Sequence, residues 1–253
     1  MAVLTPEGGA PVPEEMWWRP PEGVEVVHDL SAAGWIEELL PNYRWATVGS
    51  IVPEGFPAYA RVFHPAYRST GGRSRPWAGV IVPVRWSTVA EWSRRIVHPL
   101  MQFERIANIG ENESPSWGEP PQVGTLPREV RLSLVPILQR FTSTPQRCWF
   151  CLWDGFGEIN QLHYEGVPRV EVPGRTYLLC RGPLEAVTSF GQSPNIWWPE
   201  DRSWCVATEI DLDSTYVGGT EECLTRILTD PVLETLPAQL EDRVDLGADD
   251  INV

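Results

Sequence analysis

Proline and glycine restrict the fold of this chain more than any other feature. Its 253 residues include 25 prolines and 21 glycines. Proline removes a backbone donor and breaks helices, and glycine weakens both helices and strands. We therefore expect many turns, short elements and few long helices. Since 42% of the residues are hydrophobic, the chain can still bury a sizeable core, in one large domain or two small ones.

Apolar periodicity places the expected elements between these breaks. Helical spacing of apolar residues predicts helices near 32–40, 87–107, 125–141 and 220–229, with Thr220 as the cap of the last one. Alternation predicts strands at 46–52, 58–63, 147–154, 158–163, 169–172, 175–180 and 204–212, and a short helix at 183–189. The resulting fold class is α+β, with an antiparallel meander over residues 146–217 flanked by short helices.

The ends of the chain differ in composition from the middle. Residues 1–23 form a Pro/Glu-rich leader, in which Trp17 and Trp18 are candidates to dock on the body. Residues 24–240 are expected to form a single α+β domain, with a possible internal boundary in the Gly/Pro-rich stretch 108–124. Residues 241–253 form an acidic tail that we expect to be frayed.

The charge excludes several functions. All 20 basic residues are arginines, so the chain has no lysine for a Schiff base or a phosphate-binding loop. A net charge of −14 argues against nucleic-acid binding, which depends on neutralising phosphates. Residues 61–105 nevertheless carry a net +6, which leaves −20 for the remainder. We expect no membrane span or export signal, and five reduced cysteines point to the cytoplasm.

Trp197 and Trp198 head the list of candidate binding residues. They lie in a bulky stretch between Asn195 and Trp204 that can either cover the sheet or form an exposed platform for a partner. The candidate binding set is Trp197, Trp198, Glu200, Asp201 and Arg202, together with Arg68, Arg73 and Arg75 in a loop that can bind an anion.

Glu209, Asp211 and Asp213 are the candidate metal ligands. On an extended strand from Trp204 to Leu212 these acidic residues would share one face, because alternate side chains of a strand point the same way. Three carboxylates there can hold Mg²⁺ or Ca²⁺, or an arginine, and half-solvated acids paired to arginines are the simpler interpretation. No catalytic residue set is indicated, and a cofactor is expected only in this divalent-metal alternative.

Cys148 and Cys151 form a Cys-x-x-Cys pair, but they fall within a strand pattern. Alternation would place Trp149, Cys151 and Trp153 on one face and Cys148, Phe150 and Leu152 on the other. Because both faces are apolar, the pattern favours a buried central strand over a zinc site.

Several runs resemble a family of uncharacterised hypothetical proteins from actinobacteria. They are Cys-Trp-Phe-Cys-x-Trp-x-Gly from Cys148, Arg-x-Tyr-Leu-Leu-x-Arg-Gly-Pro from Arg175, Pro-Asn-x-Trp-Trp-Pro-Glu-Asp-Arg-x-Trp-Cys from Pro194, and Glu-Ile-Asp-Leu-x-Ser-Thr-Tyr-Val-Gly-Gly from Glu209. The resemblance covers mainly residues 125–237 and implies no function. The helix–meander–helix layout is also similar to that of the SUKH group of toxin-immunity proteins, a likeness of fold only.

From these features we expect a non-enzymatic binding protein. It would recognise a protein partner through the Asn195–Trp204 segment and the surrounding acidic surface, as an immunity or defence protein does with a basic toxin. The alternative is a metal-assisted enzyme that acts on an anionic small substrate, with its metal on Glu209, Asp211 and Asp213. Carbohydrate binding on exposed tryptophans is a third possibility, disfavoured because no export signal is expected.

Overall fold

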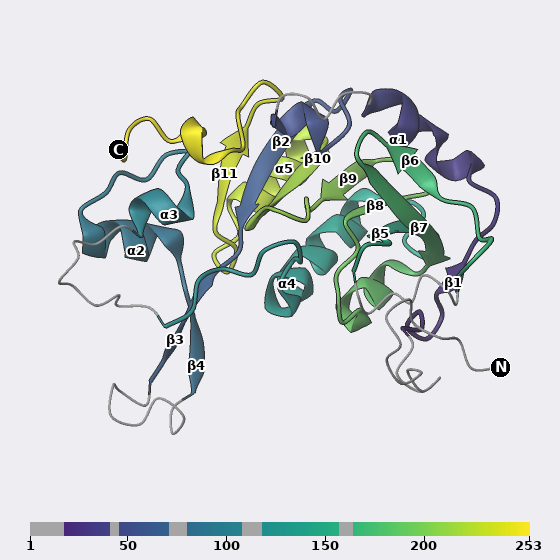
Figure 1. Cartoon of the computed structure of the whole chain (residues 1–253), viewed down its shortest axis with the longest axis horizontal. Helices are drawn as coiled ribbons and strands as arrows, with labels where there is room; N and C mark the ends of the chain where they lie inside the picture. The colour runs from purple at the N-terminus through teal and green to yellow at the C-terminus, as the bar shows by residue number, and fades with distance from the viewer. Residues whose placement is uncertain (1–17, 41–45, 71–79, 108–117, 157–163) are drawn as a thin grey trace, which may run out of the picture.

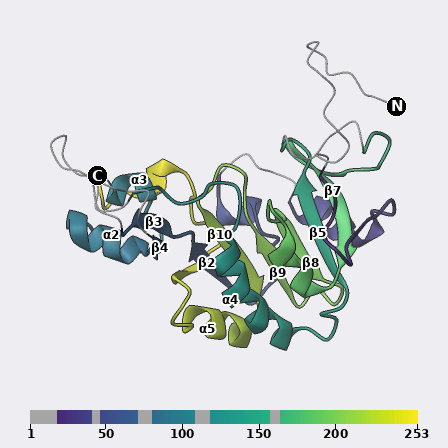
Figure 2. The ribbon, with the colours of Figure 1, turned by 90° about the horizontal axis from the view of Figure 1, so that it is seen from below.

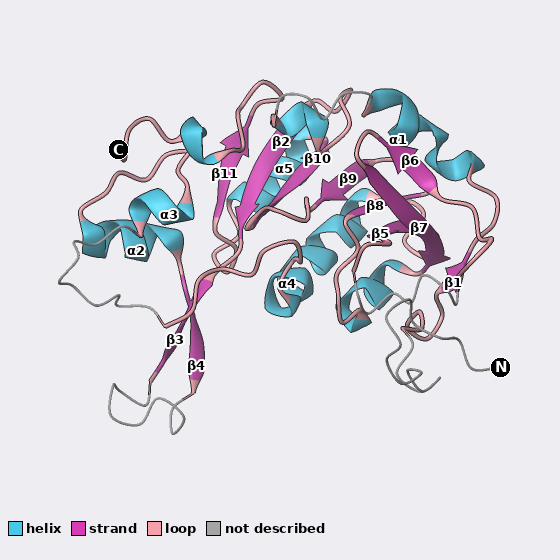
Figure 3. Cartoon of the chain, viewed as in Figure 1, coloured by secondary structure: helices cyan, strands magenta, loops and turns pink. Residues whose placement is uncertain are grey.

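A computed structural model describes residues 18–40, 46–70, 80–107, 118–156 and 164–253 of the protein. The chain has an α+β fold, in which short helices pack on a large antiparallel sheet and a two-stranded hairpin extends away from it (Figures 1 and 3). No helix in these ranges has both the length and the apolar character needed to cross a membrane.

Nine strands form the large sheet, in the order β1-β7-β5-β8-β9-β10-β2-β11, with β6 paired to β7. Within the described residues, all strand pairings of this sheet are antiparallel. The strands are β1 (Glu25–Val26), β2 (Ala58–Phe63), β5 (Cys148–Trp153), β6 (Val170–Val172), β7 (Arg175–Gly182), β8 (Ile196–Pro199), β9 (Trp204–Ala207), β10 (Ser214–Gly219) and β11 (Thr235–Ala238).

The sheet contains the predicted meander and extends beyond it. Strands β8, β9 and β10 follow one another as neighbours, whereas β5 lies between β7 and β8. The N-terminal part of the chain supplies β2, which pairs with β10 on one side and β11 on the other. Residues 58–63 are therefore an integral part of the large sheet.

Strand β5 shows how each face of the sheet is buried. Cys148, Phe150 and Leu152 enter one apolar cluster, and Trp149 and Cys151 enter a second cluster on the opposite face, as the alternation predicted. The first cluster is covered by α4 and α5 (Figure 2), and the second by α1. All five cysteines are buried and free, and burial raises the pKa of their thiols.

The helices lie close to their predicted positions, except that the span 87–107 holds two short helices, Trp86–Ser93 and Phe103–Ile106, with a non-helical connection between them. Thr220 caps α5 as expected, because its side chain accepts a hydrogen bond from the Cys223 N–H. The helices are α1 (Gly34–Leu39), α2 (Trp86–Ser93), α3 (Phe103–Ile106), α4 (Arg128–Leu138) and α5 (Glu221–Leu228). The 3₁₀ segments are Ser31–Ala33, Val48–Ser50, Gln139–Phe141, Leu184–Ser189 and Leu246–Ala248.

Two predicted strands are wrong in part, and one falls outside the described residues. Residues 46–52 contain a 3₁₀ helix, because Thr47 and Ser50 form a capping box that competes with an extended chain. The strand predicted for 204–212 ends at Ala207 and is followed by a turn. The strand predicted at 158–163 lies outside the described residues.

A side lobe stands at one end of the large sheet. It consists of α2, α3 and the hairpin of β3 (Ala66–Ser69) and β4 (Ile81–Val84), around a core that includes Phe63, Trp86 and Phe103 (Figure 1). Arg61 of β2 ties the lobe to the sheet, since its guanidinium lies over the Phe63 and Trp86 rings and donates to two lobe carbonyls, Pro99 O and Met101 O.

Both ends of the described chain pack against the body. Trp18 contacts the Tyr164 and Phe190 rings, whereas Trp17 lies outside the described residues. The expectation of a frayed acidic tail is wrong for its last part, because Asp249 and Asn252 are buried against the side lobe. Their hydrogen bonds outweigh the acidic character of the sequence around them.

Candidate functional site

The predicted recognition segment is part of the core. Trp197 and Trp198 lie on β8 and are 0% and 1% exposed, so of the two alternatives the buried one is observed and the exposed platform is not. Strand β8 runs between β5 and β9 with an apolar cluster on each face. A central strand of this kind buries both of its faces, which explains why two consecutive tryptophans are both covered.

The charged residues after Trp198 support the turn between β8 and β9. Glu200 accepts a hydrogen bond from Trp149 Nε1, and Arg202 lies over the Trp35 ring. Asp201 accepts from the Ser143 N–H and from the Thr142 and Ser143 hydroxyls. Burial alone would raise the pKa of Asp201, but these hydrogen bonds lower it to about 2. The geometry assigns these three residues to the architecture of the turn.

The three candidate metal ligands do not share one strand face. An arginine, Arg175, donates to both Glu209 and Asp211, at 2.6 Å and 3.0 Å. Asp213 lies apart from this pair, near Arg61, and accepts from the Ser214 hydroxyl. Within the described part of the chain, no three His, Cys, Asp or Glu side chains are grouped to hold a metal ion. The open alternative of an arginine partner is therefore the one observed for Glu209 and Asp211.

The predicted anion-binding loop is described only in part. Arg68 lies on β3, is exposed, and has its guanidinium 5.6 Å from the centre of the Trp92 ring. Arg73 and Arg75 lie outside the described residues. Trp92 is 39% exposed, because α2 points Trp86, Val89 and Ala90 into the lobe core instead.

A cleft of about 350 Å³ opens where the side lobe meets the large sheet. Four carboxylates line it, and several apolar side chains form its walls, two of them well exposed: Val123 at 57% and Leu246 at 43%. We call it the acidic cleft; its lining is Ala46, Gln102, Phe103, Glu104, Val123, Asp211, Leu212, Asp213, Val244, Asp245 and Leu246.

Two of the four carboxylates in the acidic cleft have a basic partner. Asp211 is bound by Arg175 and Asp245 by Arg243. Among the described residues, no basic side chain lies within ion-pair distance of Glu104 or Asp213. Burial raises the pKa of the Asp213 carboxyl, Arg61 lowers it, and the neighbouring Glu104 carboxylate raises it again. The cleft thus holds negative charge, and a cation that entered it would reduce the repulsion between the carboxylates.

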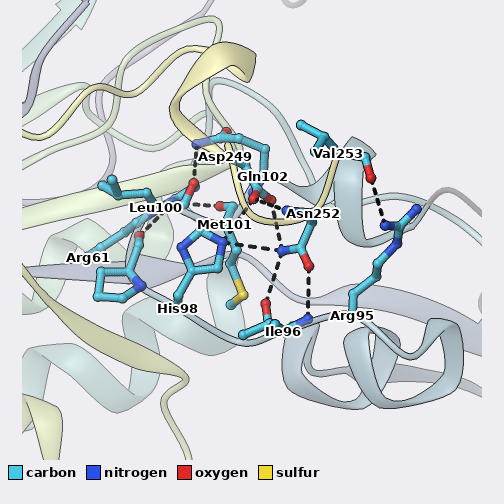
Figure 4. Close-up of polar contacts among 11 residues, drawn as sticks. Arg61, Arg95, Ile96, His98, Leu100, Met101, Gln102, Asp249, Asn252 and Val253 are labelled. Atoms are coloured by element: carbon cyan, nitrogen blue, oxygen red, sulfur yellow. Dashed lines mark hydrogen bonds and ion pairs between the residues drawn. The ribbon is translucent and has the colours of Figure 1, made fainter.

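A polar clamp made by Asp249 and Asn252 (Figure 4) follows the part of the cleft wall formed by residues 244–246. The Asp249 carboxylate accepts a hydrogen bond from the Gln102 N–H, and its Oδ1 lies 2.9 Å from His98 Nε2. Asn252 exchanges hydrogen bonds with the backbone of Ile96. Burial would raise the pKa of Asp249, but the hydrogen bonds that its carboxylate makes with Asn252, Gln102 and His98 outweigh this effect and lower the pKa. The clamp joins the C-terminal segment to the α2–α3 connection.

His64 has the hydrogen-bond pattern of a catalytic base but no access to a substrate. Its Nδ1 lies 2.6 Å from Gln122 O and its Nε2 lies 2.8 Å from Thr215 Oγ1. Since a carbonyl only accepts, Nδ1 carries the proton and the Thr215 hydroxyl donates to Nε2. Both side chains are fully buried, and neither lines the acidic cleft. We therefore assign this pair to the core.

Sequence reasoning identified Asp211 and Asp213 but missed the other side of the acidic cleft. Glu104 and Asp245 come from segments far apart in the chain, and no local spacing links them.

No family model, curated protein or solved structure matches the chain, so the resemblance to actinobacterial hypothetical proteins stays a prediction.

Proposed function

We propose that the protein is a non-enzymatic binding protein whose acidic cleft receives a basic segment of a protein partner. The observation that carries this proposal is the pair of carboxylates, Glu104 and Asp213, that line the acidic cleft with no basic side chain in ion-pair distance among the described residues, although Arg61 acts on Asp213 from further away. Their mutual repulsion costs free energy that a bound cation recovers.

The walls of the cleft support a side chain as the ligand rather than a free ion. Val123 and Leu246 expose apolar surface next to the carboxylates. Arginine and lysine carry an aliphatic stem and a charged end, so one such residue matches both features. The net charge of −14 also favours a basic partner, because complementary charge speeds encounter. An inhibitor or immunity protein of a basic cytoplasmic target would have this profile.

The metal-assisted alternative has less support. Arg175 already places its guanidinium between Glu209 and Asp211, where a divalent ion would have to bind. Asp211 and Asp213 both line the acidic cleft, and Asp213, the third candidate ligand, interacts electrostatically with Arg61. We therefore base the proposed function on the cleft and not on the Glu209 group.

A peptide titration tests the proposal. We expect a fluorescent peptide of alternating arginine and leucine to bind the wild type, and Glu104→Gln/Asp213→Asn to weaken binding about tenfold or more, as loss of charge-assisted contacts does. Glu221→Gln/Glu222→Gln, at the exposed start of α5, is the matched control and should bind as the wild type does. Equal affinity of all three proteins would contradict the proposal.

The natural partner can be sought with a photo-crosslinking residue at Val123, on the cleft wall. A control residue at Leu132, which is exposed on α4, samples an unrelated surface. We expect an adduct in native cells only from position 123, and its loss when Glu104→Gln/Asp213→Asn is added. An adduct that survives this double change would show that the cleft carboxylates do not select the partner.

A further inference from the structure

Among the described residues, one side of the hairpin β3–β4 carries an apolar and basic surface that is only partly covered. Paired residues of an antiparallel hairpin share a face, so Arg68 and Val82 lie together, and Val80 lies on the same face two residues further along. Trp92 of α2 joins them through its contact with Arg68. We call Arg68, Val80, Val82 and Trp92 the arm surface.

The arm surface begins where the lobe core ends. Ala66 and Val84, on the same hairpin face, are buried against Trp86 and Val89 of α2. Beyond the end of the helix the face continues uncovered among the described residues, and Val80 is 69% exposed. A tryptophan stacked with an arginine and bordered by valines is the composition of an interface hot spot.

The edges of the hairpin do not favour strand addition. Pro83 removes an N–H from β4, and proline at a sheet edge discourages pairing with another strand. Tyr67 of β3 is already paired with residues 118–119 through its N–H and C=O. Docking on the hairpin therefore uses the side chains of its face.

Charge identifies an occupant for the arm surface. Residues 61–105 carry a net +6 and the rest of the chain −20, so the basic part of this acidic molecule includes Arg68 on β3 and Arg85, Arg94 and Arg95 at the two ends of α2. The acidic cleft has the complementary character: carboxylates beside exposed Val123 and Leu246. An arginine and a tryptophan next to valines match carboxylates next to aliphatic walls in both charge and polarity.

We propose that the arm surface of one copy docks into the acidic cleft of a second copy. The inference rests on the proposed function, because it uses the same cleft as a receptor. The contact is head-to-tail, with different surfaces on the two copies, so it forms closed rings or open chains rather than a two-fold dimer. A copy bound in this way has its cleft filled, and self-association competes with the basic partner.

The dependence on salt concentration distinguishes this contact from non-specific self-association. Two copies of charge −14 repel each other, but at about 0.15 M salt this repulsion is screened beyond about 8 Å and only charges in contact matter. Raising the salt to about 1 M therefore weakens the proposed contact. An association driven by apolar surface alone would strengthen or stay constant over the same range.

Sedimentation velocity of the full chain tests the proposal. We expect the mean mass to rise with protein concentration in the micromolar range for the wild type. Arg68→Glu/Trp92→Ala and Glu104→Gln/Asp213→Asn should each remove this rise. Leu132→Ala, an exposed leucine on α4, is the control and should associate as the wild type does.

Mixing the two variants gives the decisive measurement. The first retains an intact cleft and the second an intact arm surface, so an equimolar mixture should form a heterodimer although neither variant associates alone. Failure of the mixture to dimerise, or a wild type that is monomeric throughout, overturns the inference. The peptide titration on the arm variant, whose cleft is unchanged, shows separately whether the proposed function holds.

Discussion

At the residue scale, buried polar groups decide more of this structure than exposed ones. Arg61 and Arg131 are both buried and donate to backbone carbonyls instead of carboxylates. Burial lowers the pKa of Arg131 to about 10 and that of His64 to about 4. These groups bond to distant segments of the chain, although Arg131 Nε has no hydrogen-bond partner among the described residues, and the sequence around each group therefore does not reveal its contacts.

His64 makes the stability depend on pH. Its pKa in the folded state is about 4, below the unfolded value of 6.5, so protonation favours the unfolded chain. The stabilisation is fully present above pH 6.5 and is lost as the pH falls to 4, by about 3 kcal/mol over the whole window. Denaturant unfolding of the wild type and His64→Gln at pH 7 and pH 4.5 measures this.

The difference in unfolding free energy between wild type and His64→Gln should shrink on acidification. Asp213, whose pKa is raised, acts in the opposite direction but is present in both proteins and cancels in the comparison. A difference that is constant with pH would mean that the imidazole is not held in its neutral form.

At the scale of elements, ends are set by caps and turns. Helix α2 ends at Arg94, an exposed residue with a φ of 57°. This left-handed conformation costs an L-residue about 1 kcal/mol and suits glycine. We expect Arg94→Gly to raise the free energy of unfolding by about 0.5–1 kcal/mol. Glu91→Gly in the same helix is the matched comparison and should lower it by about 1 kcal/mol, which thermal unfolding can resolve.

Elements with a strong local signal were predictable from the sequence. The strand at 58–63 has its predicted limits, and α5 starts at its predicted Thr220 cap. The failure at 46–52 is local, since it comes from the capping box of Thr47 and Ser50, but the others involve tertiary contacts. The strand at 204–212 ends at Ala207, and Glu209 just beyond it is held by Arg175, 34 residues away in the chain. The burial of Trp197 and Trp198 depends on neighbours that cover both faces of β8. For the same reason, only one side of the acidic cleft could be anticipated.

At the scale of the whole molecule, the clamp formed by Asp249 and Asn252 connects the C-terminal segment to the side lobe (Figure 4). The lobe is also held by Arg61 and by Glu234, whose carboxylate accepts from the first N–H groups of α2. These attachments come from separate segments, so the position of the lobe depends on the folded whole.

Removing the clamp should loosen the lobe. Asn252→Ala leaves the Ile96 N–H and C=O without this partner, and we expect a loss of about 2 kcal/mol in the free energy of unfolding. Hydrogen exchange at the Ile96 amide should accelerate while β5 remains protected. Asp250→Ala, at an exposed neighbouring position, is the control. Unchanged hydrogen exchange at the Ile96 amide in Asn252→Ala would show that the clamp does not stabilise the side lobe.

The position of β2 also governs how the chain is made. Strand β2 ends at Phe63, but its two neighbours in the sheet begin at Ser214 and Thr235. A ribosome that adds roughly 5–20 residues per second needs on the order of 10–30 s to deliver β10 after β2 has emerged. During synthesis, the apolar segment Ala58–Phe63 therefore stays unpaired for this time. It is a defined segment to which a nascent-chain chaperone can bind. The pairing of β2 with β10 and β11 is complete only when the last fifth of the protein has been translated.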